Sequence, residues 1–221
     1  MECVKIVNLY DLQHTIAKPL LENFTYPWEA LSHIGKFITE LQKTLSKDDY
    51  DVINENVYVA KTAKVAATAT LNGPAIICDG AELRTGAFIR GNVIIGANCV
   101  AGNSCEFKNA ILFDNVQVPH FNYVGDSILG HRSHMGAGSI TSNVKSDKTL
   151  VKVRCGEEII ETGLKKFGAM LGDNVEVGCN SVLNPGTVVC KNSNIYPLSC
   201  VRGVVPANSI FKTGGKIVEK K

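Results

Sequence analysis

A few polar side chains in one short stretch of the sequence could perform chemistry. Arg90 and Lys108 stand eighteen residues apart, with Glu106 just before Lys108, and His120 and Tyr123 follow. Two cations on one surface suit a phosphate group, because arginine binds it through a planar fork and lysine as a point charge. A nearby histidine can accept a proton near neutral pH. These residues therefore indicate proton transfer on a phosphorylated molecule, unless the cations form a solvated surface ladder and His120 is an ordinary loop histidine.

A strict six-residue repeat contains Arg90 and Lys108 and must position them. Neither the 3.6-residue period of a helix nor the two-residue period of a strand gives apolar side chains at every sixth position. A short strand followed by a corner does, so the repeat predicts a parallel β-helix. In known hexapeptide folds three such segments make one triangular coil, which would stack Arg90 and Lys108 on the same face. Ten consecutive apolar positions carry the repeat: Val59, Val65, Leu71, Ile77, Leu83, Ile89, Ile95, Ala101, Phe107 and Phe113.

The repeat is interrupted twice. The first interruption lies between Phe113 and Leu129 and contains His120 and Tyr123. The second runs from Asn143 to Lys166, where two short alternating segments around a Gly-Glu turn predict a protruding hairpin. Interruptions in a rigid column are where loops, and usually sites, are placed. The repeat resumes at Leu171, Val177, Leu183, Val189, Ile195 and Val201.

Residues 1–50 lack the repeat and have helical spacing instead. Residues 4–7 favour a short strand. Pro27 suits the first position of a longer helix, whose apolar residues from Trp28 to Leu45 fall on one face. We predict that this segment forms a helical cap over the open end of the column, where unpaired backbone groups would invite aggregation. The alternative is a separate binding function.

The predicted fold is therefore all-β, a parallel β-helix with a short α-helical N-terminal cap. Its expected boundaries are residues 1–50 for the cap, 51–212 for the β-helix and 213–221 for a basic tail that follows a closing strand.

The bulk composition excludes several classes of function. A formal net charge of +2 implies neither a nucleic-acid partner nor a membrane-surface partner. We find no charged leader followed by an apolar stretch and no apolar run near the length of a membrane span, so we expect a soluble, cytoplasmic protein. None of the eight cysteines belongs to a CxxC pair, and we expect them to be reduced.

Three motifs resemble one enzyme family. Residues 102–109, 119–126 and 136–143 are similar to the acetyltransferase domain of the bifunctional glucosamine-1-phosphate acetyltransferase / N-acetylglucosamine-1-phosphate uridylyltransferase. Residues 165–169 and 184–186 resemble the archaeal sugar-1-phosphate nucleotidylyltransferases that carry a fused acetyltransferase. The similarity extends over roughly residues 75–212 and leaves the nucleotidyltransferase domain unmatched, so nucleotidylyl transfer is not expected.

The resemblance implies a left-handed β-helix that assembles as a homotrimer and binds acetyl-CoA, as co-substrate, between neighbouring prisms. Arg90 and Lys108 would hold the phosphate of a sugar phosphate or sugar nucleotide, and Tyr123 would contact this acceptor. His120 would be the general base, with Asn143 helping to orient the site. An imidazole suits this task, because the attacking amine or hydroxyl must lose a proton before it reacts with a thioester.

The resemblance also implies positions for the cofactor. The family's acyl-CoA contacts correspond to Ala137, Cys179 and Pro197, with Lys212 a looser match, and backbone N–H groups of residues 136–138 could stabilise an oxyanion. His134 stands where the family has an asparagine that touches the sugar. This difference leaves the identity of the acceptor open.

Two other functions compete with an acetyl-CoA:amino-sugar acetyltransferase of the kind used in UDP-N-acetylglucosamine and cell-wall synthesis. One is a hexapeptide carbonic anhydrase, since His120, His131 and His134 are potential zinc ligands. The acetyltransferase, which we favour, would need no metal. The other is a non-catalytic module that binds a sugar nucleotide or regulates another enzyme.

Overall fold

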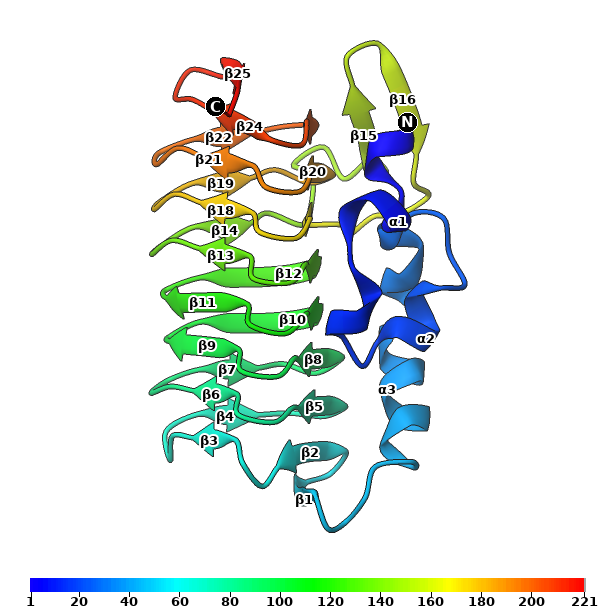
Figure 1. Ribbon diagram of the computed structural model, residues 1–221, viewed down its shortest axis with the longest axis vertical. Coiled ribbons are helices and arrows are strands. Elements are labelled where there is room, and N and C mark those ends of the chain that lie inside the picture. Colours follow the sequence, from blue (N-terminus) through cyan, green and yellow to red (C-terminus); the bar gives the residue numbers. More distant parts are fainter. Residues whose placement is uncertain (221) are drawn as a thin grey trace.

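The computed structural model describes residues 1–220 and contains a three-sided column of stacked, parallel coils (Figure 1). The first face consists of β2 (Val57–Ala60), β5 (Ala75–Ile77), β8 (Val93–Ile95), the ends of β10 (Glu106–Leu112) and β12 (Tyr123–Leu129), β17 (Ala169–Leu171), β20 (Thr187–Val189) and β23 (Val204–Val205). The second consists of β3 (Lys64–Val65), β6 (Glu82–Leu83), β9 (Val100–Asn103), β11 (Gln117–His120), β13 (His134–Met135), β18 (Glu176–Val177), β21 (Asn194–Ile195) and β24 (Ser209–Phe211). The third consists of β4 (Thr70–Leu71), β7 (Phe88–Ile89), the beginnings of β10 and β12, β14 (Ile140–Thr141), β19 (Val182–Leu183) and β22 (Cys200–Val201).

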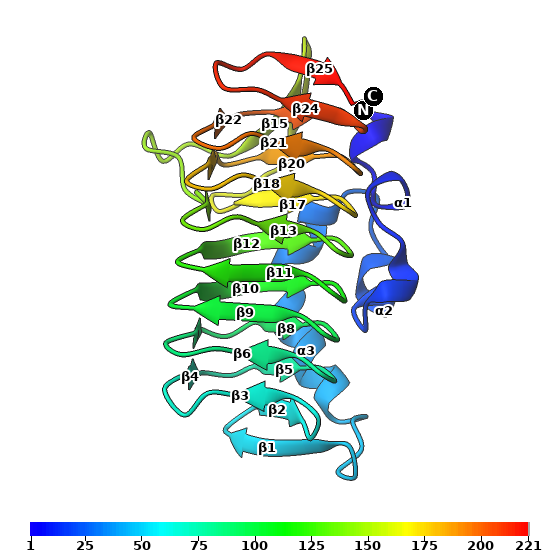
Figure 2. The ribbon, with the colours of Figure 1, turned by 60° about the vertical axis from the view of Figure 1, so that its left-hand side comes forward.

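The coils wind in the left-handed sense that the resemblance predicted. In Figure 2 the strands of the nearest face, such as β6, β9 and β11, point to the left while the chain climbs. Strands of neighbouring coils pair in parallel and in register, as when Leu83 lies beside Ala101 and Phe107 beside Val124. The predicted β-helix is therefore confirmed.

The six-residue repeat also predicts the interior of the column. Nine of the ten repeat positions are buried. The positions from Val59 to Phe107 lie in register inside the coils, whereas the interior partner of Ile95 is Leu112, one residue before Phe113. Val65 is the exception, with 36% of its surface exposed. It belongs to the first strand of its face, and within residues 1–220 no strand pairs with β3 from below.

A second apolar column points outward from the first face, and the N-terminal segment covers it. Side chains alternate along a strand, so the residue next to each interior position must face away from the core. From β5 to β20 on this face those residues are fully buried, and helix α3 (Ile34–Gln42) packs against β5, β8 and β10. The outward column consists of Ile76, Ile94, Ile111, Ile128, Met170 and Val188.

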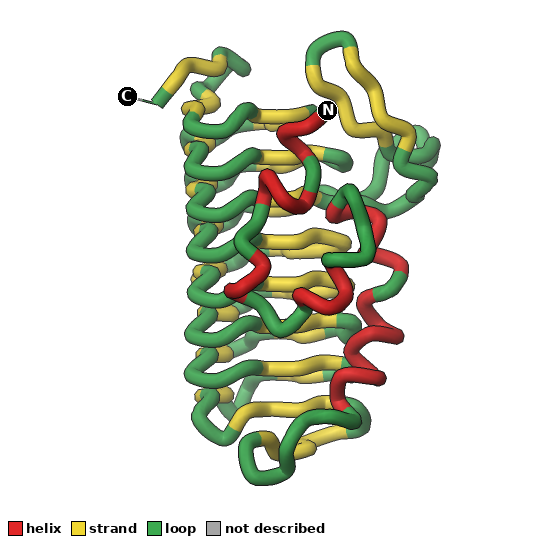
Figure 3. The backbone as a smooth tube through the Cα atoms, turned by 45° about the vertical axis from the view of Figure 1, so that its right-hand side comes forward, coloured by secondary structure: helices red, strands yellow, loops and turns green. Residues whose placement is uncertain are grey.

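The N-terminal segment is helical as predicted, but it does not cap the open end of the column. Figure 3 shows the helices along one side of the coils. They are η1 (Glu2–Val4), α1 (Ile6–Leu9), η2 (Leu12–His14), α2 (Lys18–Leu21), η3 (Pro27–Ser32) and α3. The strand predicted at residues 4–7 is therefore wrong. The outward column explains the sideways position, because its apolar side chains leave water only when another element covers them.

Antiparallel strands lie at both ends of the column instead. β1 (Tyr50–Asn54) pairs with β2 at one end, and β25 (Ile217–Glu219) pairs with β24 at the other. The predicted hairpin is confirmed as β15 (Lys152–Cys155) and β16 (Glu158–Glu161). Lys221, the last residue of the predicted tail, lies outside the described residues. No helix within residues 1–220 is long and apolar enough to cross a membrane.

One corner of the column varies in length. The repeat between neighbouring coils is 18 residues in the lower part, 17 around Asp126, 42 across the hairpin and 16 near the upper end. All of these changes fall in the turn from the third face to the first, which we call the variable corner, while the other two turns keep one length. The variable corner comprises residues 72–74, 90–92, 108–109, 125–126, 142–168, 184–186 and 202–203.

Trp28→Ala should lower the free energy of unfolding by about 3–5 kcal/mol, the usual cost of deleting a buried aromatic ring. Trp28 is 2% exposed, and its ring stacks on Phe167 of the column with 5.6 Å between centroids. Val7→Ala is the control, because Val7 is 76% exposed and its loss should stay within about 0.5 kcal/mol. Equal losses in equilibrium denaturation would show that the N-terminal segment does not stabilise the column.

Candidate functional site

The third face brings three of the predicted site residues, Arg90, Lys108 and Tyr123, together from three successive coils. Phe88, Glu106 and Tyr123 lie directly above one another in the ladder. Arg90 and Lys108 follow at the far edge of the same face, where the variable corner begins. The eighteen-residue spacing therefore predicted their stacking correctly.

Both cations are already paired with carboxylates of the same chain. The guanidinium Nη1 of Arg90 lies 2.6 Å from Oε1 of Glu106, and this contact raises the pKa of Arg90. The Nζ of Lys108 lies 3.9 Å from Oδ2 of Asp126. The four side chains together carry no net charge when all are ionised, so a phosphate here would compete with two carboxylates. The sequence reasoning treated the cations as free.

Asp126 is the centre of this arrangement, and sequence reasoning gave it no role. Its side chain is only 6% exposed. It accepts hydrogen bonds from the amide of Asn109 at 2.9 Å and from the amide of Asn143 at 2.5 Å, in addition to the ion pair with Lys108. A buried carboxylate needs such partners, because an uncompensated buried charge is costly. Asp126 therefore fixes the positions of Lys108 and Asn143.

Tyr123 is held by the same network. The amide of Asn143 donates a hydrogen bond of 3.2 Å to the phenolic oxygen of Tyr123. Burial raises the pKa of Tyr123, and the nearby carboxylates of Asp126 and Glu106 raise it further. The phenol therefore stays protonated at neutral pH and can donate a hydrogen bond to a bound molecule.

His120 lies at the opposite edge of the third face, at the corner between the second and third faces. Its backbone is fixed, because its N–H donates to the side chain of the buried Asn122 and its carbonyl accepts from the N–H of Gly138. Its side chain is exposed. The imidazole is thus accessible to a ligand at this corner.

The three predicted acyl-CoA contacts form a column directly above His120. The N–H of Asn180 donates to the carbonyl of Ala137, and the N–H of Leu198 donates to the carbonyl of Cys179. Each of these bonds is equivalent to the bond from the N–H of Gly138 to the carbonyl of His120, one and two coils higher. Together with the ladder of the second face, they stack His120, Ala137, Cys179 and Pro197 at one corner. We call these four residues the corner column.

Lys212 lies one position away from this column. By strand register, Lys212 lies directly above Tyr196 in the next coil. The following residue, Thr213, donates through its hydroxyl to the carbonyl of Pro197 at 3.4 Å. The looser match predicted for Lys212 thus corresponds to a place beside the corner column, one coil above Pro197.

The oxyanion prediction is only partly compatible with the structure. The N–H of Gly136 donates to Val177, and the N–H of Gly138 donates to His120. No protein acceptor for the N–H of Ala137 lies within hydrogen-bonding distance in the described part of the chain. Of the three predicted groups, the Ala137 amide is the one that can still bind an oxyanion.

His134 does not meet the other site residues within this chain. It belongs to β13 of the second face, and its Nδ1 lies 2.8 Å from Oε2 of Glu176 in the next coil. Arg90, Lys108 and Tyr123 belong to the third face.

The three histidines considered as zinc ligands do not converge within one chain. The Nδ1 of His131 lies 2.9 Å from the carbonyl of Asp114, and its ring stacks on His14 with 3.8 Å between centroids. His134 contacts Glu176, and His120 lies at another corner. Among residues 1–220 no three His, Cys, Asp or Glu side chains are grouped so that they could hold a metal ion.

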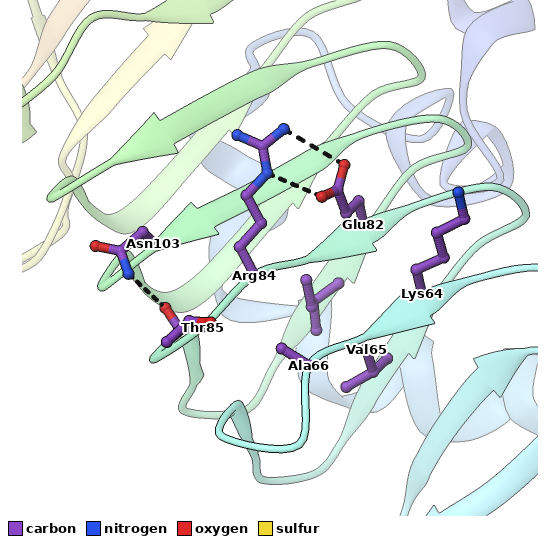
Figure 4. Close-up of a pocket in the computed structure, with 8 residues that line it drawn as sticks. Lys64, Val65, Ala66, Glu82, Arg84, Thr85 and Asn103 are labelled. Carbon is purple, nitrogen blue, oxygen red and sulfur yellow. Dashed lines mark hydrogen bonds and ion pairs between the residues drawn. The ribbon is translucent and has the colours of Figure 1, made fainter.

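A hollow on the second face lies below His120, and Figure 4 shows its lining. Arg84 points to Glu82, with 3.0 Å between Nε and Oε1, and the amide of Asn103 donates to the carbonyl of Thr85. Lys64 stands apart from Arg84, with Glu82 between them in this view. None of the predicted site residues lines this hollow.

Residues 71–197 match the family model described as the GMPPB C-terminal domain. This match covers more than half of the chain, so the chain belongs to that family. The bifunctional protein GlmU of Methanococcus aeolicus is 36% identical over 112 residues, which are 50% of this chain and 27% of that protein. The bifunctional sugar-1-phosphate nucleotidylyltransferase/acetyltransferase of Sulfurisphaera tokodaii is 32% identical over 102 residues, 46% of this chain and 25% of that protein.

The chain thus spans about a quarter of the length of these curated relatives. Among solved structures, the acetyltransferase domain of PglB from Neisseria gonorrhoeae, in complex with acetyl coenzyme A, is 14% identical. The alignment has a TM-score of 0.33 and covers 69% of this chain and 60% of that one.

The Asp126 network predicts strong coupling between two side chains. In a double-mutant cycle of Asp126→Ala and Asn143→Ala, we expect a coupling free energy of about 1.5–3 kcal/mol, because a buried carboxylate and its donor interact directly. Glu82→Ala and Arg84→Ala form the control cycle. That pair is substantially exposed, and its coupling should be about 0.2–1 kcal/mol. A coupling for Asp126 and Asn143 no larger than the control would contradict the central role of Asp126.

Proposed function

We propose that this protein is an acetyl-CoA-dependent acetyltransferase whose acceptor is an amino-sugar phosphate or a sugar nucleotide. The observation that carries the proposal is the position of His120, which stands at the foot of the corner column and at the edge of the third face. Acetyl-CoA along the corner column would bring its thioester to His120, and an acceptor across the third face would reach the same point. The family membership and the named activities of the relatives support this assignment.

The proposed reaction needs one proton acceptor and no covalent enzyme intermediate. The imidazole of His120 removes a proton from the acceptor amine or hydroxyl as that group attacks the thioester carbon. The N–H of Ala137 stabilises the resulting oxyanion. The carbon–sulfur bond then breaks, the acetyl group stays on the acceptor, and the imidazolium returns its proton to the departing thiolate.

The other end of the third face would hold the acceptor. Arg90 and Lys108 would bind its phosphate, each exchanging part of its contact with a carboxylate for a contact with the phosphate. Tyr123, which lies between these cations and His120, would donate a hydrogen bond to the sugar, with Asn143 orienting its phenol.

We also propose that the active protein is a homotrimer. The resemblance assigns His134 to the sugar site, yet within this chain it lies on another face. A neighbouring prism would complete the site, with His134 of the partner subunit approaching the acceptor. Light scattering or sedimentation of the purified protein tests the assembly, and a monomer or a dimer would contradict it.

Acetyl transfer is tested by incubating the protein with acetyl-CoA and a panel of amino-sugar phosphates and nucleotide-activated amino sugars, with release of free thiol as the readout. We expect acetylation of at least one acceptor, identified by mass spectrometry of the product. Thiol release from no member of the panel would favour the non-catalytic binding module instead.

His120→Ala should lower kcat by roughly 10²–10⁴-fold, the usual contribution of a positioned general base. The affinity for acetyl-CoA, measured by calorimetry, should hardly change. His14→Ala is the matched control, because His14 lies on the N-terminal segment, stacked on His131. Full activity of the His120 variant would show that another group is the base.

Arg90→Ala and Lys108→Ala should mainly raise KM for a phosphorylated acceptor, by roughly 10- to 100-fold for the loss of one charge-assisted contact. The effect should shrink when the acceptor lacks its phosphate. Arg84→Ala serves as the control, because Arg84 has a similar carboxylate pair but lies on the second face. An equal rise in KM for both acceptors would show that Arg90 and Lys108 are solvated surface residues and do not bind the phosphate.

A further inference from the structure

A groove of about 560 Å³ runs from the proposed phosphate site along helix α3. Its column side includes Lys108, Asp126 and Asn92, and its helix side includes Ser32, Lys36 and Thr39. We call it the α3 groove. Lys108 belongs both to this groove and to the third face, so the two surfaces are continuous across the variable corner.

Three contacts hold α3 in place as a wall of this groove. Just before α3 begins, the amide of Asn109 donates to the carbonyl of Leu31 in η3 at 3.2 Å. At the other end of α3, the buried amide of Gln42 donates to backbone carbonyls of the column at 2.9 and 3.0 Å. Between them, Gly35 approaches Asn92 so closely that a Cβ atom would lie 2.4 Å from its side-chain oxygen. The helix is therefore fixed, and so is the position from which Lys36 extends.

Lys36 adds a positive charge that the phosphate site itself does not have. Lys108 is beside Asp126 and Arg90 is beside Glu106. Lys36 also lines the groove, and it makes no ion pair within 4.0 Å in the part of the chain that the structure describes. A lysine ammonium is a common partner for phosphate. The positive charge that no carboxylate of the site offsets is thus supplied by Lys36 of helix α3.

We propose that the α3 groove binds the nucleoside diphosphate portion of the acceptor, with Lys36 on the phosphate nearer the nucleoside. This inference rests on the proposed acetyl transfer and favours a sugar nucleotide over a sugar phosphate as its acceptor. A sugar phosphate has a single phosphate, which would bind at Lys108 and leave the rest of the groove empty. The hydroxyls of Ser32 and Thr39 and the amide of Asn92 supply donors and acceptors for a ribose. The groove volume falls within the range of 300–1,000 Å³ that is usual for small-molecule sites.

The proposed order of groups along the surface follows from these positions. The reacting amine or hydroxyl lies at His120, the sugar beside Tyr123, the first phosphate at Arg90 and Lys108, and the second phosphate at Lys36. The specificity for a nucleotide thus comes from the N-terminal segment, which lies outside residues 71–197 matched by the family model.

Calorimetry on the full chain, without acetyl-CoA, tests the site independently of catalysis. The probes are UDP, GDP, dTDP and ADP, together with glucosamine 1-phosphate. We expect at least one nucleoside diphosphate to bind more tightly than glucosamine 1-phosphate. Lys36→Ala should weaken that binding roughly tenfold, Lys36→Arg should largely retain it, and neither should alter the binding of glucosamine 1-phosphate.

Lys43→Ala is the matched control, because Lys43 directly follows α3 but pairs with Glu40 at 2.8 Å outside the groove. Binding of no nucleoside diphosphate, or an equal effect of the Lys36 and Lys43 variants, would overturn the inference. Acetylation of glucosamine 1-phosphate alone, with kinetics unaffected by Lys36→Ala, would also overturn it and leave the proposed acetyl transfer intact. Nucleoside diphosphate binding that depends on Lys36 would support the site even if acetyl transfer failed.

Discussion

Each coil of the column must hydrogen-bond to the coil beneath it, and this requirement places nearly every other group in the molecule. Parallel strands pair in register, so a side chain has fixed neighbours one coil above and one coil below. Residues far apart in sequence therefore stand in vertical lines. Ala137, Cys179 and Pro197 form such a line above His120, and Arg90 and Lys108 form another at the opposite edge. The third face between these two lines has the width of a few residues, which suits a small elongated ligand.

The N-terminal segment depends on the same stacking. Register places the outward residues of the first face in one continuous apolar line, and only a covering element can remove that line from water. Helix α3 and its neighbours provide the cover. Because α3 is fixed against the column, its polar side chains face the variable corner from a constant distance. The element that completes the core thus also forms one wall of the groove beside Lys108.

The sequence predicted the column well because neither a helix nor a single strand places apolar residues at every sixth position. Val59 to Phe107 keep one phase in the structure, and the stacking of Arg90 on Lys108 follows from that phase alone. The sideways position of the helices was missed, although the sequence carries a signal for it. Ile76, Ile94 and Ile111 each extend an interior position into an apolar run, and a run of this kind marks a strand that is buried on both sides.

The partners of the site residues were harder to predict. Glu106 pairs with Arg90, sixteen residues before it, and Asp126 pairs with Lys108, eighteen residues before it, so both pairings depend on where the shortened turn falls within the coil. The six-residue pattern locates the loss of phase only to the stretch between Phe113 and Leu129, whereas the structure places the first shortened turn at residues 108–109. For the same reason Asp126 was read as part of a motif and not as the residue that holds Lys108 and Asn143. Side-chain orientation cannot be inferred from register alone.

The variable corner has a consequence for how such a protein diversifies. A residue gained or lost there changes the turn but leaves the strands of all three faces in register, so the interior is not disturbed. The hairpin of β15 and β16 is the largest example, since it enters at this corner and the coil above it continues normally. Ligand preference can thus drift by insertion and deletion as well as by point substitution, without a new fold having to arise.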